Sequence, residues 1–243
     1  MAGDPDAATT DAVIDAIVAA GVDLIELGVP YGDPLADGPT IAAAGQRALE
    51  AGMTLEGSLA IARRAHERHA IPLVFFTYAN PILQYGLERF ADAAAAAGAC
   101  GAIIPDIPLE ESESLRDVFR SRGLAFPLLV APSTPVARAA RIAAASEGFV
   151  YVVSRLGVTG AKREPDVAWI AGRLATLHEQ ASLPLAVGFG ISTAQHVRAL
   201  APFADGVVIG SALIDATGGR TSADAAARAS AYLAPIVAAL TAT

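Results

Sequence analysis

Two carboxylates within residues 26–40 are the side chains best suited to do chemistry. Glu26 lies near the end of an apolar run, residues 22–27, that predicts a buried strand, and Asp37 lies on the loop that follows. Three prolines and three glycines restrict this loop. An ionised carboxylate among apolar residues costs several kcal/mol unless it is paired, hydrogen-bonded or kept protonated by a raised pKa. The pair therefore indicates an acid–base site, although a strand-end Glu26 that simply reaches water is the alternative.

Glycine-containing segments follow the last three predicted strands. They are residues 157–160, 188–192 and 210–211. Glycine allows the backbone to approach a ligand closely, and N–H groups at the start of a helix attract anions. In (β/α)8 barrels a phosphate commonly binds beside the last two strands. The three segments together predict a phosphate site made mainly of backbone N–H groups.

Short apolar runs alternate with alanine-rich segments along the chain, which predicts repeated βα units and a parallel sheet. The runs are continuous rather than alternating, as expected where both faces of a sheet are buried. Strands are expected at residues 22–27, 72–78, 101–105, 126–131, 148–154, 184–189 and 206–210. Helices are expected at 8–20, 40–51, 54–70, 87–98, 110–122, 135–146, 166–180, 193–201 and 222–240, with a short turn from Ser211. We expect one α/β domain over residues 1–243, either closed as a TIM barrel or open and doubly wound, and the chemistry of the loops favours the closed barrel.

Composition excludes several classes of protein. The 243 residues are 53% hydrophobic and carry a formal net charge of −8, and no cluster of Lys and Arg predicts a nucleic-acid surface. No apolar run reaches the roughly 18 residues that span a bilayer. Cys100 is the only cysteine, which excludes an internal disulfide. We expect a cytoplasmic protein that binds small molecules or other proteins.

Besides an acid–base pair, enzymes with such barrels use a lysine Schiff base or a divalent metal. Lys162 is the only lysine and lies in a predicted loop rather than inside a strand. All histidines fall on predicted outer helices, and His66 with His69 is expected to form a solvated face. Both routes are therefore disfavoured, and we expect no metal site.

Five motifs, in one order along the chain, resemble the tryptophan synthase α subunit family. They are residues 26–40, 78–81, 105–111, 154–160 and 188–192. The resemblance implies a (β/α)8 barrel that cleaves indole-3-glycerol phosphate to indole and glyceraldehyde 3-phosphate by a retro-aldol reaction. It also implies an αββα complex in which pyridoxal phosphate belongs to the β subunit and the α chain carries no cofactor.

The resemblance also implies roles for individual residues. Glu26 would be the general acid and base, and Asp37 would bind the indole N–H. Tyr151 and Phe189 would line the site, and Thr159 would close against Asp37. The phosphate would be held by Gly160, Gly190, Gly210 and Ser211. The loop at Asp33, a turn at residues 78–81 and residues 106–111 would face the β subunit.

The start of the chain departs from the family pattern. In the family, the motif Ala-Gly-Asp-Pro follows a helix and the first barrel strand. Here it occupies residues 2–5, so we expect a barrel that lacks that helix and that strand. Two alternatives to the synthase subunit stay open. One is a catalytically weak module that binds and activates a β subunit, and the other is a standalone lyase.

Overall fold

The computed structural model describes residues 1–154 and 166–241, and its strands are all parallel. The predicted glycine segment 157–160, which includes Thr159 and Gly160, lies outside the described residues, and so does Lys162. Each strand overlaps one of the seven predicted runs, and only β1 extends beyond its run, by one residue at Gly28. They are β1 (Ile25–Gly28), β2 (Leu73–Phe76), β3 (Gly101–Ile103), β4 (Leu129–Val130), β5 (Val150–Val153), β6 (Leu185–Gly188) and β7 (Gly206–Val207).

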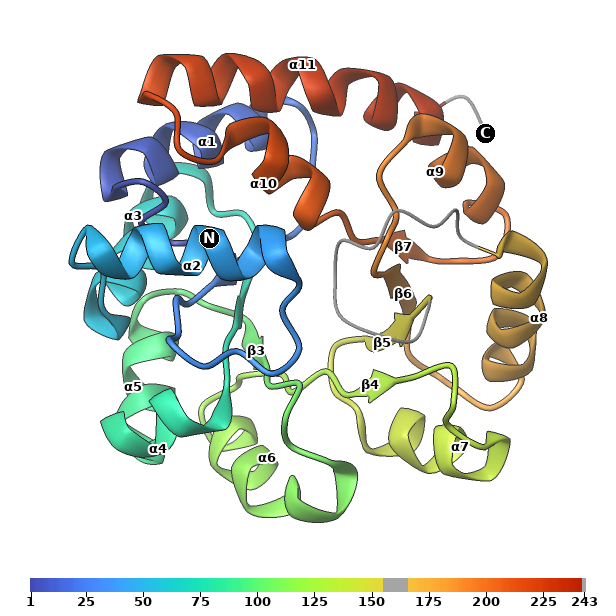
Figure 1. The fold of residues 1–243 in the computed structure, drawn as a ribbon. Helices are drawn as coiled ribbons and strands as arrows, with labels where there is room; N and C mark the ends of the chain where they lie inside the picture. Colours follow the sequence, from blue (N-terminus) through green and yellow to red (C-terminus); the bar gives the residue numbers. More distant parts are fainter. Residues whose placement is uncertain (155–165, 242–243) are drawn as a thin grey trace.

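Helices follow the strands and lie on the outside of the sheet (Figure 1). The first group is α1 (Ala7–Ala19), α2 (Pro39–Glu50), α3 (Leu55–His69), α4 (Ala79–Tyr85), α5 (Leu87–Ala96) and α6 (Glu113–Arg120), with a short 3-10 turn at Leu109–Glu111. The second group is α7 (Val136–Ala145), α8 (Val167–His178), α9 (Ala194–Leu200), α10 (Ser211–Thr217) and α11 (Ser222–Thr241). The expected α/β barrel is therefore present.

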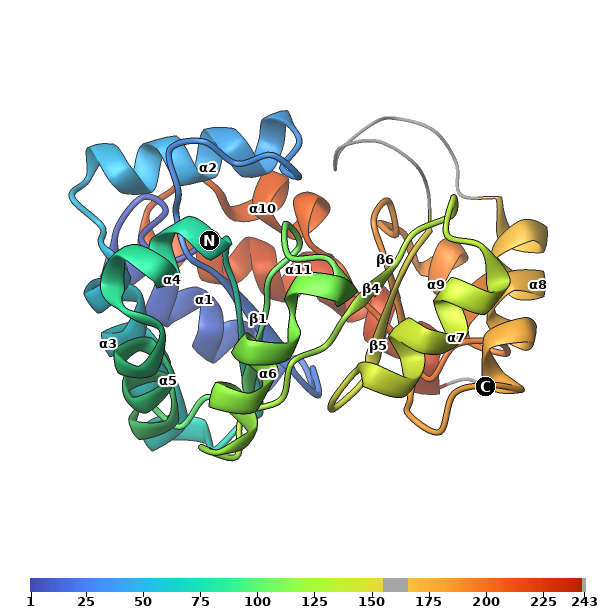
Figure 2. The ribbon, with the colours of Figure 1, turned by 90° about the horizontal axis from the view of Figure 1, so that it is seen from below.

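The strands pair in chain order, β1-β2-β3 and β4-β5-β6-β7. An isolated parallel bridge between Gly101 and Ala125 joins β3 to the segment that leads into β4. Figure 2 shows α1 to α6 and α7 to α9 on opposite sides of the strands. Because the strands are parallel and adjacent, their carboxyl ends and the loops that follow them lie at one edge of the structure.

Apolar side chains pack on both faces of the strands. The larger cluster fills the space between strands and helices, and includes the fully buried Phe75, Phe90 and Phe119. A smaller cluster contains Val74 and Tyr151, with the half-buried Phe76, Leu129, Phe149, Phe189 and Val208 packed against it. Residues 74 and 76 alternate with Phe75 along β2, so the two clusters lie on opposite faces of the sheet. This explains why the strand sequences are continuously apolar.

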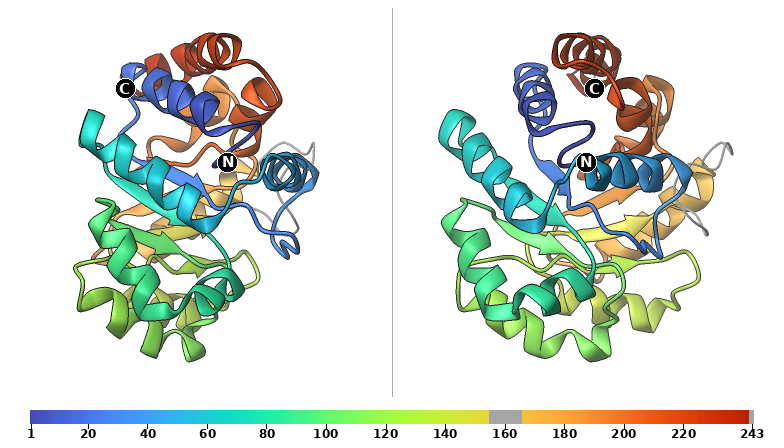
Figure 3. Two further views of the ribbon diagram at one scale, coloured as in Figure 1. Left: turned by 90° about the vertical axis from the view of Figure 1, so that its left-hand side faces the viewer. Right: turned by 60° about the vertical axis from the view of Figure 1, so that its left-hand side comes forward.

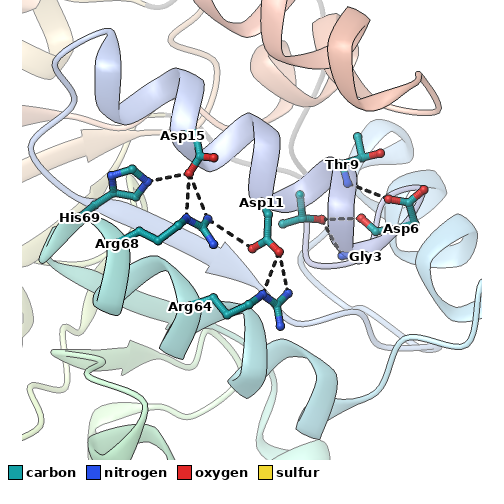
Figure 4. A network of polar contacts seen from close by, with 9 residues as sticks. Gly3, Asp6, Thr9, Asp11, Asp15, Arg64, Arg68 and His69 are labelled. Carbon is teal, nitrogen blue, oxygen red and sulfur yellow. Dashed lines mark hydrogen bonds and ion pairs between the residues drawn. The ribbon is translucent and has the colours of Figure 1, made fainter.

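Helices from the two ends of the chain pack together. α1 and α11 lie side by side in every view (Figure 3). On its other flank α1 packs on α3 through ion pairs (Figure 4). Asp15 accepts a hydrogen bond from His69 at 2.6 Å, and Arg68 lies 3.0 Å from Asp15 and 3.4 Å from Asp11. This network holds together two helices that are far apart in sequence.

Side-chain caps start several of these helices. Asp6 accepts the N–H of Thr9 at the start of α1, and Thr54 accepts the N–H of Gly57 at the start of α3. The helix α4 was not expected, since residues 78–81 predicted a turn. Pro81 is tolerated there because it lies in the first helical turn, where a backbone N–H has no partner within the helix. Among the described residues, no helix is long and apolar enough to cross a membrane.

Candidate active site

Glu26 occupies the second position of β1, opposite Val74 of β2. Its Oε1 atom is buried and has no hydrogen-bond partner among the residues that the structure describes. Removal from water disfavours the charged form, and it raises the pKa of Glu26 from 4.5 to about 8. The carboxyl is therefore mainly protonated near neutral pH and can donate a proton.

Asp37 lies on the loop between β1 and α2, immediately before the glycine that precedes that helix. The hydroxyl of Tyr78 donates a hydrogen bond to its Oδ1 atom at 2.9 Å. Partial burial is the larger effect and raises the pKa of Asp37 above its ordinary value, while the hydrogen bond from Tyr78 limits this rise by stabilising the carboxylate. The same end of the sheet thus carries two carboxyl groups in different surroundings, one without a partner and one hydrogen-bonded.

Tyr151 and Phe189 form an aromatic wall. Tyr151 is 3% exposed, and its ring meets that of Phe189 edge to face, with centroids 5.9 Å apart. Burial raises the pKa of Tyr151, and the negative charge of Glu26 raises it further, so the two groups are within electrostatic reach. A Cβ atom added at Gly188 would overlap the Tyr151 hydroxyl, so only glycine fits there without a shift of the ring.

The turn after β6 has an unusual backbone. Phe189 adopts a φ of 68° and Gly190 a φ of 92°, both in the left-handed region. The Ser154 hydroxyl donates to the carbonyl oxygen of Phe189, and the N–H of Ser154 donates to the carbonyl oxygen of Gly188 at 3.0 Å. These bonds fix a conformation that a non-glycine residue such as Phe189 rarely adopts.

Gly210 and Ser211 lie beside this turn at the sheet edge. β6 and β7 are neighbours, with Ala186 opposite Gly206. Gly210 precedes the first residue of α10, Ser211, and the N–H of Ile214 donates to the Gly210 carbonyl oxygen at 3.1 Å. Two of the three predicted glycine segments, 188–192 and 210–211, therefore follow adjacent strands. The third, 157–160, lies outside the described residues.

The histidines lie on outer helices, as expected: His66 and His69 on α3, His178 on α8 and His196 on α9. His69 does not only face solvent, because it bonds Asp15, and His178 bonds the carbonyl oxygen of Phe203 at 3.0 Å. These contacts connect helices to neighbouring segments. They have no link to the carboxylates at the sheet edge.

Tyr78 belongs to this candidate site although the sequence pattern did not place it there. It was assigned to a partner-facing turn, whereas its side chain is 2% exposed and bonds Asp37. One signal was available in the sequence. Tyr78 directly follows the second predicted strand, so a parallel sheet brings it to the same edge as the loop that carries Asp37.

The chain is similar to known proteins over nearly its whole length. Residues 1–239 match the family model described as tryptophan synthase alpha chain. The chain is 50% identical over 214 residues to the tryptophan synthase alpha chain of a Picosynechococcus species, which covers 88% of this chain and 81% of the relative.

Solved structures are similar over nearly the whole chain. Tryptophan synthase subunit alpha from Legionella pneumophila is 32% identical with a TM-score of 0.89, covering 100% of this chain and 90% of that one. A chain of Mycobacterium tuberculosis tryptophan synthase is 36% identical with a TM-score of 0.87, covering 97% and 88%.

Proposed function

Because the chain belongs to the tryptophan synthase alpha chain family, lyases that act on indole-3-glycerol phosphate in tryptophan biosynthesis, we propose that Glu26 and Asp37 carry out its retro-aldol step. The observation that carries this proposal is the Glu26 carboxyl, whose Oε1 atom is buried without a hydrogen-bond partner among the described residues and whose pKa is raised to about 8. A carboxyl that is protonated near neutral pH suits a group that must first donate a proton and then accept one.

The first step is protonation of the substrate indole ring. The Glu26 carboxyl gives its proton to C3 of the ring, which leaves a carboxylate and places positive charge at the ring nitrogen. Asp37 accepts the hydrogen bond of the N–H group and stabilises this charge. Asp37 therefore has to be ionised, and the hydrogen bond from Tyr78 favours that state.

The second step breaks the bond between C3 and the glycerol phosphate side chain. The side-chain hydroxyl loses its proton to the Glu26 carboxylate and becomes the carbonyl group of glyceraldehyde 3-phosphate. The electrons of the broken bond return to the ring and neutralise it as indole. Glu26 ends the cycle protonated, so a single carboxyl serves as both acid and base.

Tyr151 and Phe189 would contact the indole, and the opposite end of the substrate would be held by backbone groups. Gly190, Gly210 and Ser211 are the described members of that phosphate site. Its support is the left-handed turn after β6 beside the start of α10, at the ends of adjacent strands. Thr159 and Gly160 are retained in the proposal because of the family resemblance alone.

The proposed partner is a β subunit in an αββα complex, with pyridoxal phosphate bound only by that subunit. The support is a hollow of about 420 Å³ between the loop after β1 and α4, lined by residues that include Val29, Tyr31 and Pro81. Leu35 and Leu83 are 73% and 60% exposed on the same loop and helix. Exposed apolar side chains beside a hollow fit a protein–protein contact.

Indole release from indole-3-glycerol phosphate tests the proposal, measured for wild type, Glu26→Gln and Asp37→Asn with and without a β subunit. We expect release by the wild type, stimulation by the β subunit, and near-background rates in both variants. Full activity in Glu26→Gln would rule out the mechanism. Absence of release from the wild type in both conditions would favour the non-catalytic module instead.

A further inference from the structure

The hydroxyl of Tyr78 makes two hydrogen bonds to the loop that carries Asp37. It donates to Asp37 Oδ1 at 2.9 Å and accepts the backbone N–H of Ala36 at 3.1 Å. Because Tyr78 is only 2% exposed, bulk water does not compete for these bonds. One phenol therefore joins the end of β2 to two consecutive residues of the active-site loop.

The backbone that carries Tyr78 is itself fixed by a carboxylate. The N–H of Ala79, the first residue of α4, donates to both oxygens of Asp106, at 3.0 and 3.2 Å. Asp106 thus satisfies an N–H group that has no partner within the helix, and its charge suits the positive end of α4. Tyr78 immediately precedes Ala79, so this cap also fixes the position of the Tyr78 backbone from which the phenol extends.

A second contact holds the ring of Tyr78 from the side. Its centroid lies 5.5 Å from that of Tyr31, on the loop after β1. The Tyr31 hydroxyl in turn accepts a hydrogen bond from the Asn80 side chain at 3.1 Å. The segment 78–80 therefore contacts two other segments through three consecutive residues, and a shift of Tyr78 would break several of these contacts together.

We infer that Tyr78 is a positioning residue for the cleavage reaction: its hydroxyl fixes the direction and the charge of the Asp37 carboxylate, and Asp106 holds Tyr78 in place. With Oδ1 bound to the phenol, the rotation of the carboxylate is restricted and Oδ2 is left to accept the N–H of the substrate. The inference rests on the proposed role of Asp37 at the indole nitrogen. It adds a group that acts through Asp37 and does not itself touch the reacting atoms.

The substitution Tyr78→Phe removes the hydroxyl and keeps the ring. A hydrogen bond to a charged group typically contributes enough to change a rate by about 10- to 100-fold, so kcat should fall within that range. The KM for indole-3-glycerol phosphate should change by less than about threefold, since the carboxylate itself remains. The acid limb of the kcat/KM profile should move to higher pH, because the charged form of Asp37 loses a donor.

Tyr85→Phe is the matched control. Tyr85 ends the same helix, α4, and the Arg89 guanidinium lies 4.5 Å from its ring centroid. Because Tyr85 also lines the hollow assigned to the β subunit, the control is assayed without that subunit, and it should then leave kcat and the acid limb unchanged.

A second variant keeps the test decisive if Tyr78→Phe does not fold, which circular dichroism would reveal. Asp106→Asn weakens the cap of α4 and leaves the phenol intact, and it should lower kcat and shift the acid limb in the same direction. Unchanged kcat and acid limb in a folded Tyr78→Phe, or in Asp106→Asn if Tyr78→Phe is unfolded, overturn the inference while the wild type stays active. A wild type that releases no indole overturns the proposed function instead, so the two failures are distinguishable.

Discussion

The two sides of the barrel mouth, at the ends of β1 and β2 and at the ends of β6 and β7, carry different kinds of polar group. At the ends of β1 and β2 the polar groups are side chains: Glu26, Asp37 and Tyr78. At the ends of β6 and β7 they are mainly backbone groups, displayed by a left-handed turn and by Gly210. A substitution on the first side changes charge and proton affinity with little change in the shape of the site. A substitution on the second side mainly changes the shape of the backbone and the space around it.

The largest effect is expected from Glu26→Gln, which keeps the shape and removes the titrating group. Indole release should fall by about 10²- to 10⁴-fold, the usual range for a general acid or base. Enzyme assays at substrate saturation would measure the loss. A variant that retained more than a tenth of wild-type activity would show that the first side does not work through the proton of Glu26.

The same substitution should stabilise the protein at alkaline pH. The folded pKa of Glu26, about 8, lies above its ordinary value of 4.5, so its protonated form favours folding below pH 4.5, and this advantage is lost as the pH rises through 8. Glu26→Gln should therefore match wild type at pH 4.5 and exceed its free energy of unfolding at pH 9 by up to a few kcal/mol. Urea unfolding at both pH values measures this. Equal stability at pH 9 would contradict a buried, unpartnered carboxyl.

On the backbone side, Gly188→Ala tests shape. The new Cβ would overlap the hydroxyl end of Tyr151, so the variant should lose about 1–3 kcal/mol of stability and bind substrate less tightly. Gly172→Ala is the matched control, because no atom lies within 4 Å of its added Cβ and it sits inside α8. It should gain about 0.5–1 kcal/mol. Equal changes of stability and substrate binding in the two variants would show that the backbone side does not depend on the shape at Gly188.

The smallest effect is expected far from the mouth, where α1 packs on α3. Hydrogen bonds from His69 and Arg68 outweigh desolvation and hold the pKa of Asp15 below its ordinary value. Its contribution is therefore present above pH 3.8 and is lost as the pH falls through the folded pKa. Asp15→Asn should cost only about 0.2–1 kcal/mol near neutral pH, and less in high salt, since the pair is exposed. Thermal unfolding at two salt concentrations would check it, and a loss that salt does not reduce would argue against ion pairing.

Several features of the fold and site follow from local sequence, and others depend on distant contacts. The strands were predicted because a strand buried on both faces must be continuously apolar, and Glu26 stood out as the charge within such a run. The helix α4 was missed because the Asn80-Pro81 pair reads as a turn signal, whereas the Asp106 cap that supports the helix comes from another strand's loop.

The requirement for glycine at position 188 was not readable from its own segment. It depends on the pairing of β5 with β6, where Tyr151 lies opposite Ala186, two residues before Gly188 on the same face. The bond between Tyr78 and Asp37 likewise depends on where a loop places a carboxylate relative to the end of the neighbouring strand. Sequence pattern predicts which strand ends meet, and the structure adds which atoms bond.

The central claim is that burial keeps Glu26 protonated near neutral pH on the side-chain half of the mouth. Infrared difference spectroscopy of the folded wild type, with Glu26→Gln as the reference, measures this protonation directly. We expect a protonated carboxyl signal that titrates near pH 8 and is absent from the variant. A wild-type signal that disappears near pH 4.5, as for a carboxyl in water, would contradict the account.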